Sequence, residues 1–433
     1  MNNRTFSKLK ERLISSSFFK DSFWAVGGNG LGSGLLLLSG ILIARLLGKD
    51  LYGEYGMVKT TMFLLALFST FALGDTSTKY IAEYVKKDKT RVRELIKDSL
   101  QISLITSLAM SIALVAFAQQ LADFINAPQL VLSFRFLGLI IVVRSLNTVA
   151  SGILGGVRYY KQLGVYNVIS GIVMLITCIP LTYYFSLSGA LLSLVLSQFI
   201  LTVLTLKEVW IVYRTFPIGQ NIGYIRELLV FSFPFALNEL IFSISSWGKS
   251  LLLTKYSSLG ELGMYSAASQ WFAIVLVIPG LLGNVILSYL SSSAAESSNT
   301  HNTIIKRMLL ANFVSTLIPL VGVALCSGWI TDYYGPTFAG MQIVLLIAIS
   351  GAVFACMSRV YQSALMSENR KWAAFGVRSS YNAMNLVISF IVLKFTDGVD
   401  AARNMALVGL FVNFLSLILY IGVYYSKRKS PSY

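Results

Sequence analysis

An uncharged apolar stretch that occurs twice constrains this chain more than any other feature. No charged residue lies between Asp21 and Arg45, so residues 22–44 can form a helix long enough to cross a bilayer. A polar turn with the text LYGEYG follows. Shifting the numbering by 210 places Gly53 on Gly263, where the turn reads ELGMYS. The repeat predicts two copies of one multi-helix unit.

Composition places the chain in a membrane. Hydrophobic residues make up 55% of the 433 residues and charged residues only 12%, which leaves too little polar surface for a soluble globule of this length. The apolar segments run to about 20 residues and lack the strict alternation of a membrane barrel strand. The sequence therefore predicts an all-α polytopic membrane protein.

Apolar runs broken by charged or Pro/Gly-rich text predict twelve transmembrane helices. Twelve is six plus six, so both repeats have the same orientation. We expect two six-helix lobes, 1–217 and 218–433, related by a pseudo-two-fold axis along the membrane normal. The connection 207–227 is the natural linker between them. The predicted spans are 22–44, 57–73, 98–118, 131–154, 164–185, 187–206, 228–253, 264–290, 308–330, 341–363, 372–394 and 403–425.

The distribution of positive charge predicts the orientation. Most of the 35 Lys and Arg residues lie in the two tails and the even-numbered connections, and the largest cluster is KKDKTRVRELIK at 86–97. Because positive residues stay on the cytoplasmic side, both termini are expected in the cytoplasm. We interpret the 86–97 cluster as a topology determinant and a contact with anionic lipids. The net charge of +16 belongs mostly to these loops, so no nucleic-acid partner is expected.

Several texts carry a family resemblance. GNGLGSGLLLLSGILIARLLGKDLYGEYG, FALGDTSTKYIAEY and GGVRYYKQLGVYNVISG resemble the first lobe of the polysaccharide-transport branch of the multidrug/oligosaccharidyl-lipid/polysaccharide (MOP) exporter superfamily. FPFALNELIFSIS and ELGMYSAASQW resemble the start of its second lobe. Bacterial O-antigen flippases belong to this branch. The resemblance implies two six-helix bundles that expose a central cavity alternately to each side of the membrane.

The resemblance also implies a cargo and a location. The cargo is an oligosaccharide repeat unit on undecaprenyl pyrophosphate, moved across the bacterial cytoplasmic (inner) membrane for O-antigen, lipopolysaccharide or another surface polysaccharide. Membrane lipids surround such a transporter. A polysaccharide polymerase and a chain-length regulator are further implied partners.

Charges inside the spans mark candidate pathway residues, because each costs about 2.5–3.5 kcal/mol to insert. Arg135 and Arg144 lie in the fourth span, Arg378 in the eleventh, and Glu239 near the middle of the seventh. Three further cations lie near span ends, where long stems can carry the charge to the headgroups: Lys59, Lys249 and Arg359.

The mid-depth arginines head polar stripes at helical spacing. Asn147 follows Arg144, and Asn382 and Asn385 follow Arg378. Amides and hydroxyls in such stripes can serve instead as interhelical contacts, but an arginine at mid-depth favours a wet, cationic cavity. A guanidinium offers phosphate oxygens a planar fork of donors. The predicted substrate-binding residues are Arg144, Arg378, Arg135, Asn147, Asn382, Asn385 and Asn29.

Glu239 is the candidate coupling group, with two alternatives open. It can pair with Arg144 across the cleft as a latch between lobes, or it can bind a proton or sodium ion. No other cofactor is expected. Tyr159, Tyr160 and Trp271 could stack on sugars, although membrane-interface positions are the favoured interpretation.

Two other function classes are weaker. A cation-coupled multidrug exporter of the sister branch would need acids in its cavity, and the sequence offers Glu239 against three arginines. An enzyme of lipid-sugar assembly would need a catalytic pair, yet His301 is the single histidine and only Asp397 and Asp400 pair in a short turn. The three cysteines have no paired spacing. We therefore expect a transporter with no catalytic residue and no metal site.

Overall fold

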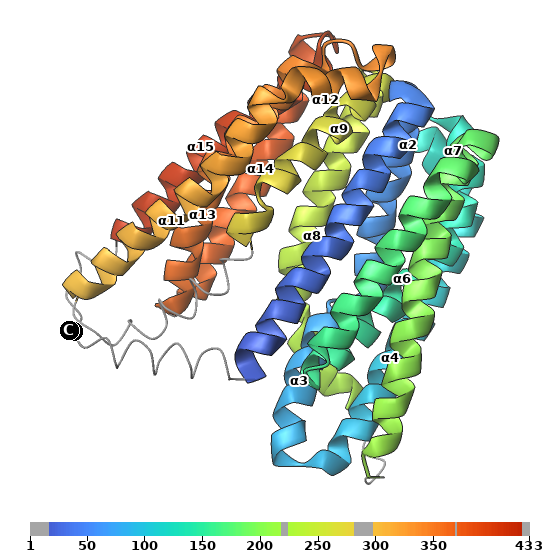
Figure 1. The fold of residues 1–433 in the computed structure, drawn as a ribbon, viewed down its shortest axis with the longest axis vertical. Coiled ribbons are helices and arrows are strands. Elements are labelled where there is room, and N and C mark those ends of the chain that lie inside the picture. The colour runs from blue at the N-terminus through green and yellow to red at the C-terminus, as the bar shows by residue number, and fades with distance from the viewer. Residues whose placement is uncertain (1–16, 218–223, 281–297, 369, 427–433) are drawn as a thin grey trace. The chain divides into compact units, whose positions relative to one another are not determined.

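The computed structural model describes residues 17–217, 224–280, 298–368 and 370–426 (Figure 1), and this part of the chain is helical with no strand. Seven of its helices are long and apolar enough to cross a membrane. The all-α membrane class is thus confirmed, while the count of twelve crossings stays a prediction.

The helices follow one another along the whole described chain. They are α2 (Ser17–Thr70), α3 (Leu73–Lys87), α4 (Lys89–Ala116), α5 (Ala118–Ile125), η1 (Pro128–Leu130), α6 (Val131–Gly156), α7 (Tyr160–Thr215), α8 (Ile225–Tyr256), α9 (Leu259–Val275), α11 (Ser298–Leu325), α12 (Ser327–Tyr334), η2 (Pro336–Phe338), α13 (Met341–Ser367), α14 (Lys371–Phe395) and α15 (Ala401–Ser426).

The two longest helices are each interrupted by one non-helical residue. In α2 this is Gly48, with φ 71° and ψ 174°, and in α7 it is Ser186, with φ 52° and ψ −132°. A Cβ on Gly189 would lie 1.8 Å from the Leu181 carbonyl oxygen, so the two arms of α7 turn back on each other at Ser186. The predicted spans 164–185 and 187–206 meet at this same residue.

Contacts divide the chain into two compact units. Unit 1 comprises Met1–Leu46 and Thr61–Leu240, and unit 2 comprises Leu47–Thr60 and Ile241–Tyr433. Both α2 and α8 therefore contribute to both units. A division by contacts does not count membrane crossings, so the six-helix lobes expected at 1–217 and 218–433 stay a prediction.

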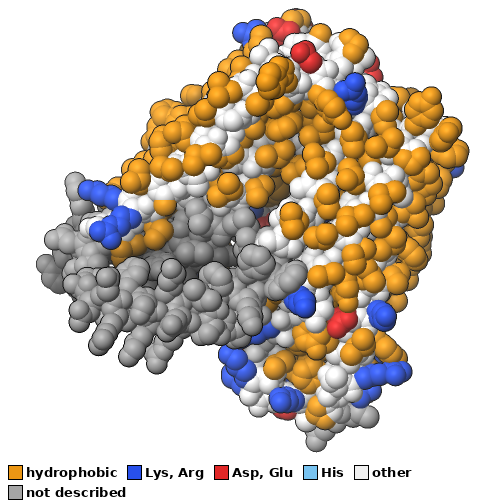
Figure 2. Space-filling model, viewed as in Figure 1, with side chains coloured by type: hydrophobic (Ala, Val, Ile, Leu, Met, Phe, Trp, Pro, Cys, Tyr) orange, Lys and Arg blue, Asp and Glu red, His pale blue; other side chains and the backbone are white. Residues whose placement is uncertain are grey.

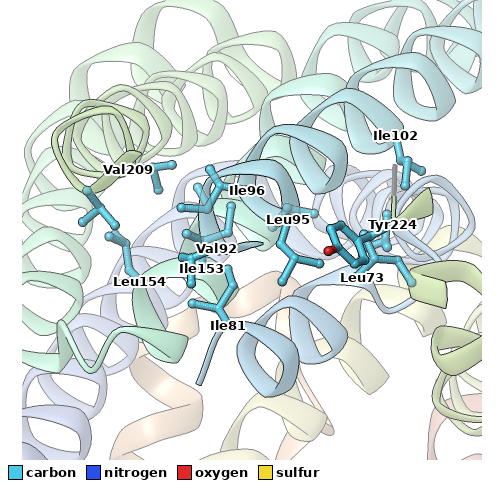
Figure 3. Packing of buried hydrophobic residues seen from close by; sticks show 14 residues of the cluster. Leu73, Ile81, Val92, Leu95, Ile96, Ile102, Ile153, Leu154, Val209 and Tyr224 are labelled. Atoms are coloured by element: carbon cyan, nitrogen blue, oxygen red, sulfur yellow. The ribbon is translucent and has the colours of Figure 1, made fainter. Parts of the chain in front are cut away.

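Unit 1 is built around α3, α4 and α6. Their buried leucines, isoleucines and valines pack together, and Figure 3 shows Tyr224 beside this cluster. The buried carboxylate of Asp98 accepts a hydrogen bond from the backbone N–H of Tyr224 at 2.8 Å. Thr76 and Ser232 share a buried hydrogen bond of 2.8 Å between their hydroxyls. These two bonds fix the beginning of α8 to unit 1.

Unit 2 packs α13 against α9, α11 and α15, with α14 beside α15. The segment Leu47–Thr60 joins this unit through α9, where the Tyr52 hydroxyl donates to Gln270 Oε1 at 3.2 Å. The Glu261 carboxylate accepts from the backbone N–H of Ala402 at 2.7 Å and so holds the start of α15.

The outer helix faces are apolar (Figure 2). On α4, for example, Ile105 and Ile112 are 68% and 69% exposed. Exposed side chains of this kind suit lipid tails and would be unfavourable in water. The fold thus presents an apolar exterior, and its few intramembrane charges stand out as functional candidates.

Candidate functional site

Arg144 lies in α6 of unit 1, and its guanidinium contacts the side-chain amide of Gln198 and the ring of Phe63. Its Nη1 donates to Oε1 of the buried Gln198 on α7 at 3.4 Å. Its guanidinium carbon lies 4.4 Å from the ring centroid of Phe63, an arrangement that favours a cation in a poorly hydrated place. A guanidinium has five N–H donors, so this contact leaves donors for an anion.

The two predicted asparagines of unit 1 join helices. Asn147 accepts a hydrogen bond from the Thr205 hydroxyl at 3.1 Å and so connects α6 to α7. Asn29 accepts from the side-chain amide of Asn167 on α7. A Cβ on Gly32 would lie 2.7 Å from the Asn167 carbonyl oxygen, so α2 and α7 approach closely here. The interhelical interpretation fits Asn147 better than a cargo contact does.

Arg135 stands apart from these residues. It lies in the second turn of α6, its side chain is exposed, and it is nine residues from Arg144. At 1.5 Å per residue the two arginines are about 13 Å apart along the helix. The structure therefore does not bring Arg135 together with Arg144 in one site.

In unit 2 the stripe on α14 combines one half-buried arginine with two buried asparagines. Arg378 is half-buried, with its guanidinium carbon 5.9 Å from the ring centroid of Phe242 on α8. Asn382 and Asn385 are each only 3% exposed. The backbone carbonyl of Asn382 accepts from the Ser245 hydroxyl on α8 at 3.3 Å. Asn382 thus contributes to helix packing, whereas Arg378 stays partly accessible.

Two further cations of unit 2, Lys249 and Arg359, differ in their surroundings. Lys249 on α8 donates to the Tyr265 hydroxyl on α9 at 3.4 Å, although its sequence position suggested that it reaches for the headgroups. Arg359 on α13 is exposed, and its charge interacts with that of Arg378. Unit 2 therefore holds several cationic groups on helices that pack against one another.

Glu239 lies half-buried in α8 and belongs by contacts to unit 1, as Arg144 does. A pairing of these two residues would therefore act within one unit and not between two. Glu239 also interacts electrostatically with Asp75 on α3.

In the described ranges no group of three or more His, Cys, Asp or Glu residues could hold a metal ion.

Of the aromatic candidates, two take part in packing. Trp271 donates its indole N–H to the Tyr334 hydroxyl at 3.1 Å, and Tyr159 packs against the core of unit 1. Sequence reasoning missed Gln198 and Asn167 as partners of the site. For Gln198 a signal existed, because it lies in a polar stripe of the sixth predicted span: Ser193, Ser197, Gln198, Thr202 and Thr205.

Comparison with known protein families identifies the family to which this chain belongs. The profile of the polysaccharide biosynthesis protein family matches residues 18–293, which is well over half of the chain. The chain belongs to this family. The resemblance to the polysaccharide-transport branch is thereby confirmed.

Two curated relatives in this family are recognisable by sequence. An EPS I polysaccharide export inner membrane protein of Ralstonia solanacearum is 25% identical over 152 residues, which are 34% of this chain and 34% of the relative. A succinoglycan biosynthesis transport protein of Rhizobium meliloti is 23% identical over 252 residues, which are 58% of this chain and 49% of the relative. The matches thus span about a third and about half of the relatives' own length.

Solved structures show the same fold. A multidrug resistance MATE family transporter of the MOP superfamily, in an inward-facing conformation, matches with a TM-score of 0.78 at 15% identity, covering 95% of this chain and 100% of that one. The lipid II flippase MurJ matches with a TM-score of 0.71 at 15% identity, covering 93% and 89%. This polysaccharide biosynthesis family member thus has the MOP transporter fold.

Proposed function

We propose that this protein is a flippase that moves undecaprenyl-pyrophosphate-linked oligosaccharide repeat units across the bacterial inner membrane by alternating access. The observation that carries the proposal is one half-buried arginine on a long helix of each unit, Arg144 on α6 and Arg378 on α14. Family membership and the polysaccharide export and transport roles in the relatives' names support it.

The chemistry of the two arginines suits a pyrophosphate headgroup. An anionic headgroup cannot enter a region of low dielectric without a compensating charge. A guanidinium supplies that charge together with two parallel donors for phosphate oxygens. The rings of Phe63 and Phe242 lie beside the two guanidinium groups, so each cation has a stabilising neighbour that does not compete with phosphate for its N–H donors.

Coupling to an ion gradient falls to Glu239 in this proposal. A half-buried carboxyl group, with Asp75 interacting with it electrostatically, can bind a proton or sodium ion in one conformation and release it in another. Both termini lie in the cytoplasm, as the positive-inside distribution indicates. O-antigen or another surface polysaccharide is the end product.

The direct test is transport by the purified protein. Vesicles containing it and a lipid-linked oligosaccharide should expose the saccharide on the opposite leaflet faster than protein-free vesicles, as measured by a membrane-impermeant glycosidase. Two carboxyl groups of unit 1 that interact with each other, Asp75 and Glu239, favour the multidrug exporter of the sister branch as second candidate. Movement of a cationic dye by the same vesicles, without movement of the lipid-linked saccharide, would replace the first proposal by the second.

A further inference from the structure

A small pocket lies where the end of α3 meets the end of α6 in unit 1. Its volume is about 110 Å³, and its lining is Ala82, Val85, Lys86, Gly156, Val157 and Arg158. The two helix ends are in close contact below it, since a Cβ on Gly156 would come within 2.9 Å of the Ile81 side chain. The lining of the pocket therefore combines small and apolar residues with two cations, Lys86 and Arg158.

Arg158 occupies a backbone position that normally takes glycine. Its N–H bonds to the Gly155 carbonyl at 3.1 Å, and the next N–H, of Tyr159, bonds to the Leu154 carbonyl at 2.9 Å. This pair of bonds is the Schellman ending of a helix, in which the residue after the cap is left-handed. Arg158 has φ 65° accordingly. An L residue in this conformation is less stable than glycine. The presence of arginine here therefore indicates that its side chain has a role.

The neighbouring carboxylates are engaged with other groups. Glu83 bonds to Lys87 at 2.8 Å and Asp88 bonds to Arg91 at 3.0 Å. The Thr90 hydroxyl, which donates to the Asp88 carboxylate, holds the pKa of Asp88 below its usual range. Within the described ranges, neither Lys86 nor Arg158 forms an ion pair with any of them. The two cations are thus available to an outside anion.

We propose that Lys86 and Arg158 bind the phosphate of an anionic phospholipid headgroup from the surrounding membrane. The pocket holds only a few water-sized groups, so it fits a phosphate and excludes an oligosaccharide chain. Further Lys and Arg side chains gather at the end of unit 1 where α3 meets α4 (Figure 2). Basic pockets between helices at the membrane surface bind acidic headgroups. The site is separate from Arg144 and the cargo proposed above.

The structure offers matched variants for the test. Arg158→Gly removes the charge while giving the left-handed position its preferred residue, so the fold is kept. Lys86→Gln removes the second charge from an exposed helix position. Lys89→Gln is the control, because Lys89 lies at the same end of unit 1, is exposed and does not line the pocket.

The measurement is retention of added lipid by the purified full-length protein in detergent, read by native mass spectrometry. Wild type should retain phosphatidylglycerol in preference to phosphatidylcholine. Arg158→Gly and Lys86→Gln should each weaken this by about fivefold, as expected for one basic residue at an anionic surface, and Lys89→Gln by less than twofold.

Three results would overturn the proposal. Equal retention by wild type and both pocket variants would show that the pocket holds no lipid. An equal loss in Lys89→Gln would show diffuse attraction and no site. Displacement of the lipid by inorganic phosphate at the same concentration would assign the pocket to free phosphate. The thermal unfolding temperature of Arg158→Gly, expected to equal or exceed that of wild type, separates lost binding from lost folding.

Discussion

Gly53 and Gly263 lie backbone against backbone in unit 2, at equivalent positions of the 210-residue repeat. A Cβ on Gly53 would lie 1.8 Å from the carbonyl oxygen of Leu259, and a Cβ on Gly263 would lie 1.9 Å from that of Lys49. Lys49 and Leu259 are themselves 210 residues apart. The turns that the sequence predicts at these positions are helical, since Gly53 lies in α2 and Gly263 in α9. These two helical segments therefore pack on each other in a reciprocal way that only glycine permits.

Alanine at either position should destabilise the protein. Gly53→Ala and Gly263→Ala force two backbones apart, and overpacking of this kind costs about 1–3 kcal/mol. The thermal unfolding temperature in detergent measures the effect. Gly409→Ala in α15 is the control, because nothing lies within 4 Å of the place that its Cβ would take, and it should be neutral or stabilising. Equal unfolding temperatures for Gly53→Ala and Gly409→Ala would refute the close contact.

Loss of either candidate cargo arginine should slow transport. Arg144→Gln and Arg378→Gln each remove a charged hydrogen bond of about 1.5–3 kcal/mol, which corresponds to roughly tenfold to a hundredfold in rate. Arg→Lys should restore only part of the rate, because an ammonium lacks the planar fork.

The same assay needs two controls for these arginines. Membrane abundance of each variant should match wild type, since a fall in abundance would indicate a structural role. Arg403→Gln should transport normally, because Arg403 is exposed and pairs with Asp400 at 3.6 Å, at the start of α15. Normal transport by both Gln variants would remove Arg144 and Arg378 from the mechanism.

A double-mutant cycle on Glu239 and Arg144 distinguishes coupling from a latch. If Glu239 binds the coupling ion, Glu239→Gln should abolish gradient-dependent transport in both the wild-type and Arg144→Gln backgrounds. Their effects on thermal stability should then add. An interaction energy well above about 0.5 kcal/mol in stability would instead establish a pair between these two residues of unit 1.

The hydrogen bond from the backbone N–H of Tyr224 to Asp98, at the beginning of α8, should stabilise the protein. Asp98→Ala leaves the buried N–H of Tyr224 without its acceptor, which costs about 1–3 kcal/mol. Asp98→Asn keeps an acceptor oxygen and should lose less. Thermal unfolding of the two variants checks the order, and an equal loss would mean that the charge of Asp98, and not its hydrogen bond, is what matters.

Sequence reasoning located helices better than it located partners. Hydropathy places the break in α7 between residues 185 and 187, and the structure has its non-helical residue at Ser186. This prediction succeeds because the apolar length of a segment depends on that segment's own residues. Spacing likewise puts Arg378 and Asn382 on one face of α14. It does not say what that face meets, and the structure shows Asn382 buried against α8 with Arg378 still partly accessible.

The grouping of segments was also beyond the sequence. The repeat relates Gly53 to Gly263, yet nothing in the pattern says that the two copies contact each other. Such a contact depends on which backbones approach, and that is decided by packing over the whole unit.

Each unit is assembled from segments that are far apart in the chain, so the ribosome makes the parts of one unit at different times. Leu47–Thr60 belongs with unit 2, but its partners around Gly263 are made about 210 residues later. At about 5–20 residues per second, this segment waits roughly 10–40 seconds for them. Conversely, unit 1 is complete only when the ribosome has passed Leu240. Unit 1 can therefore form about halfway through translation and unit 2 only at its end. A chain cut between residues 217 and 224 would leave each half without a piece of its own unit.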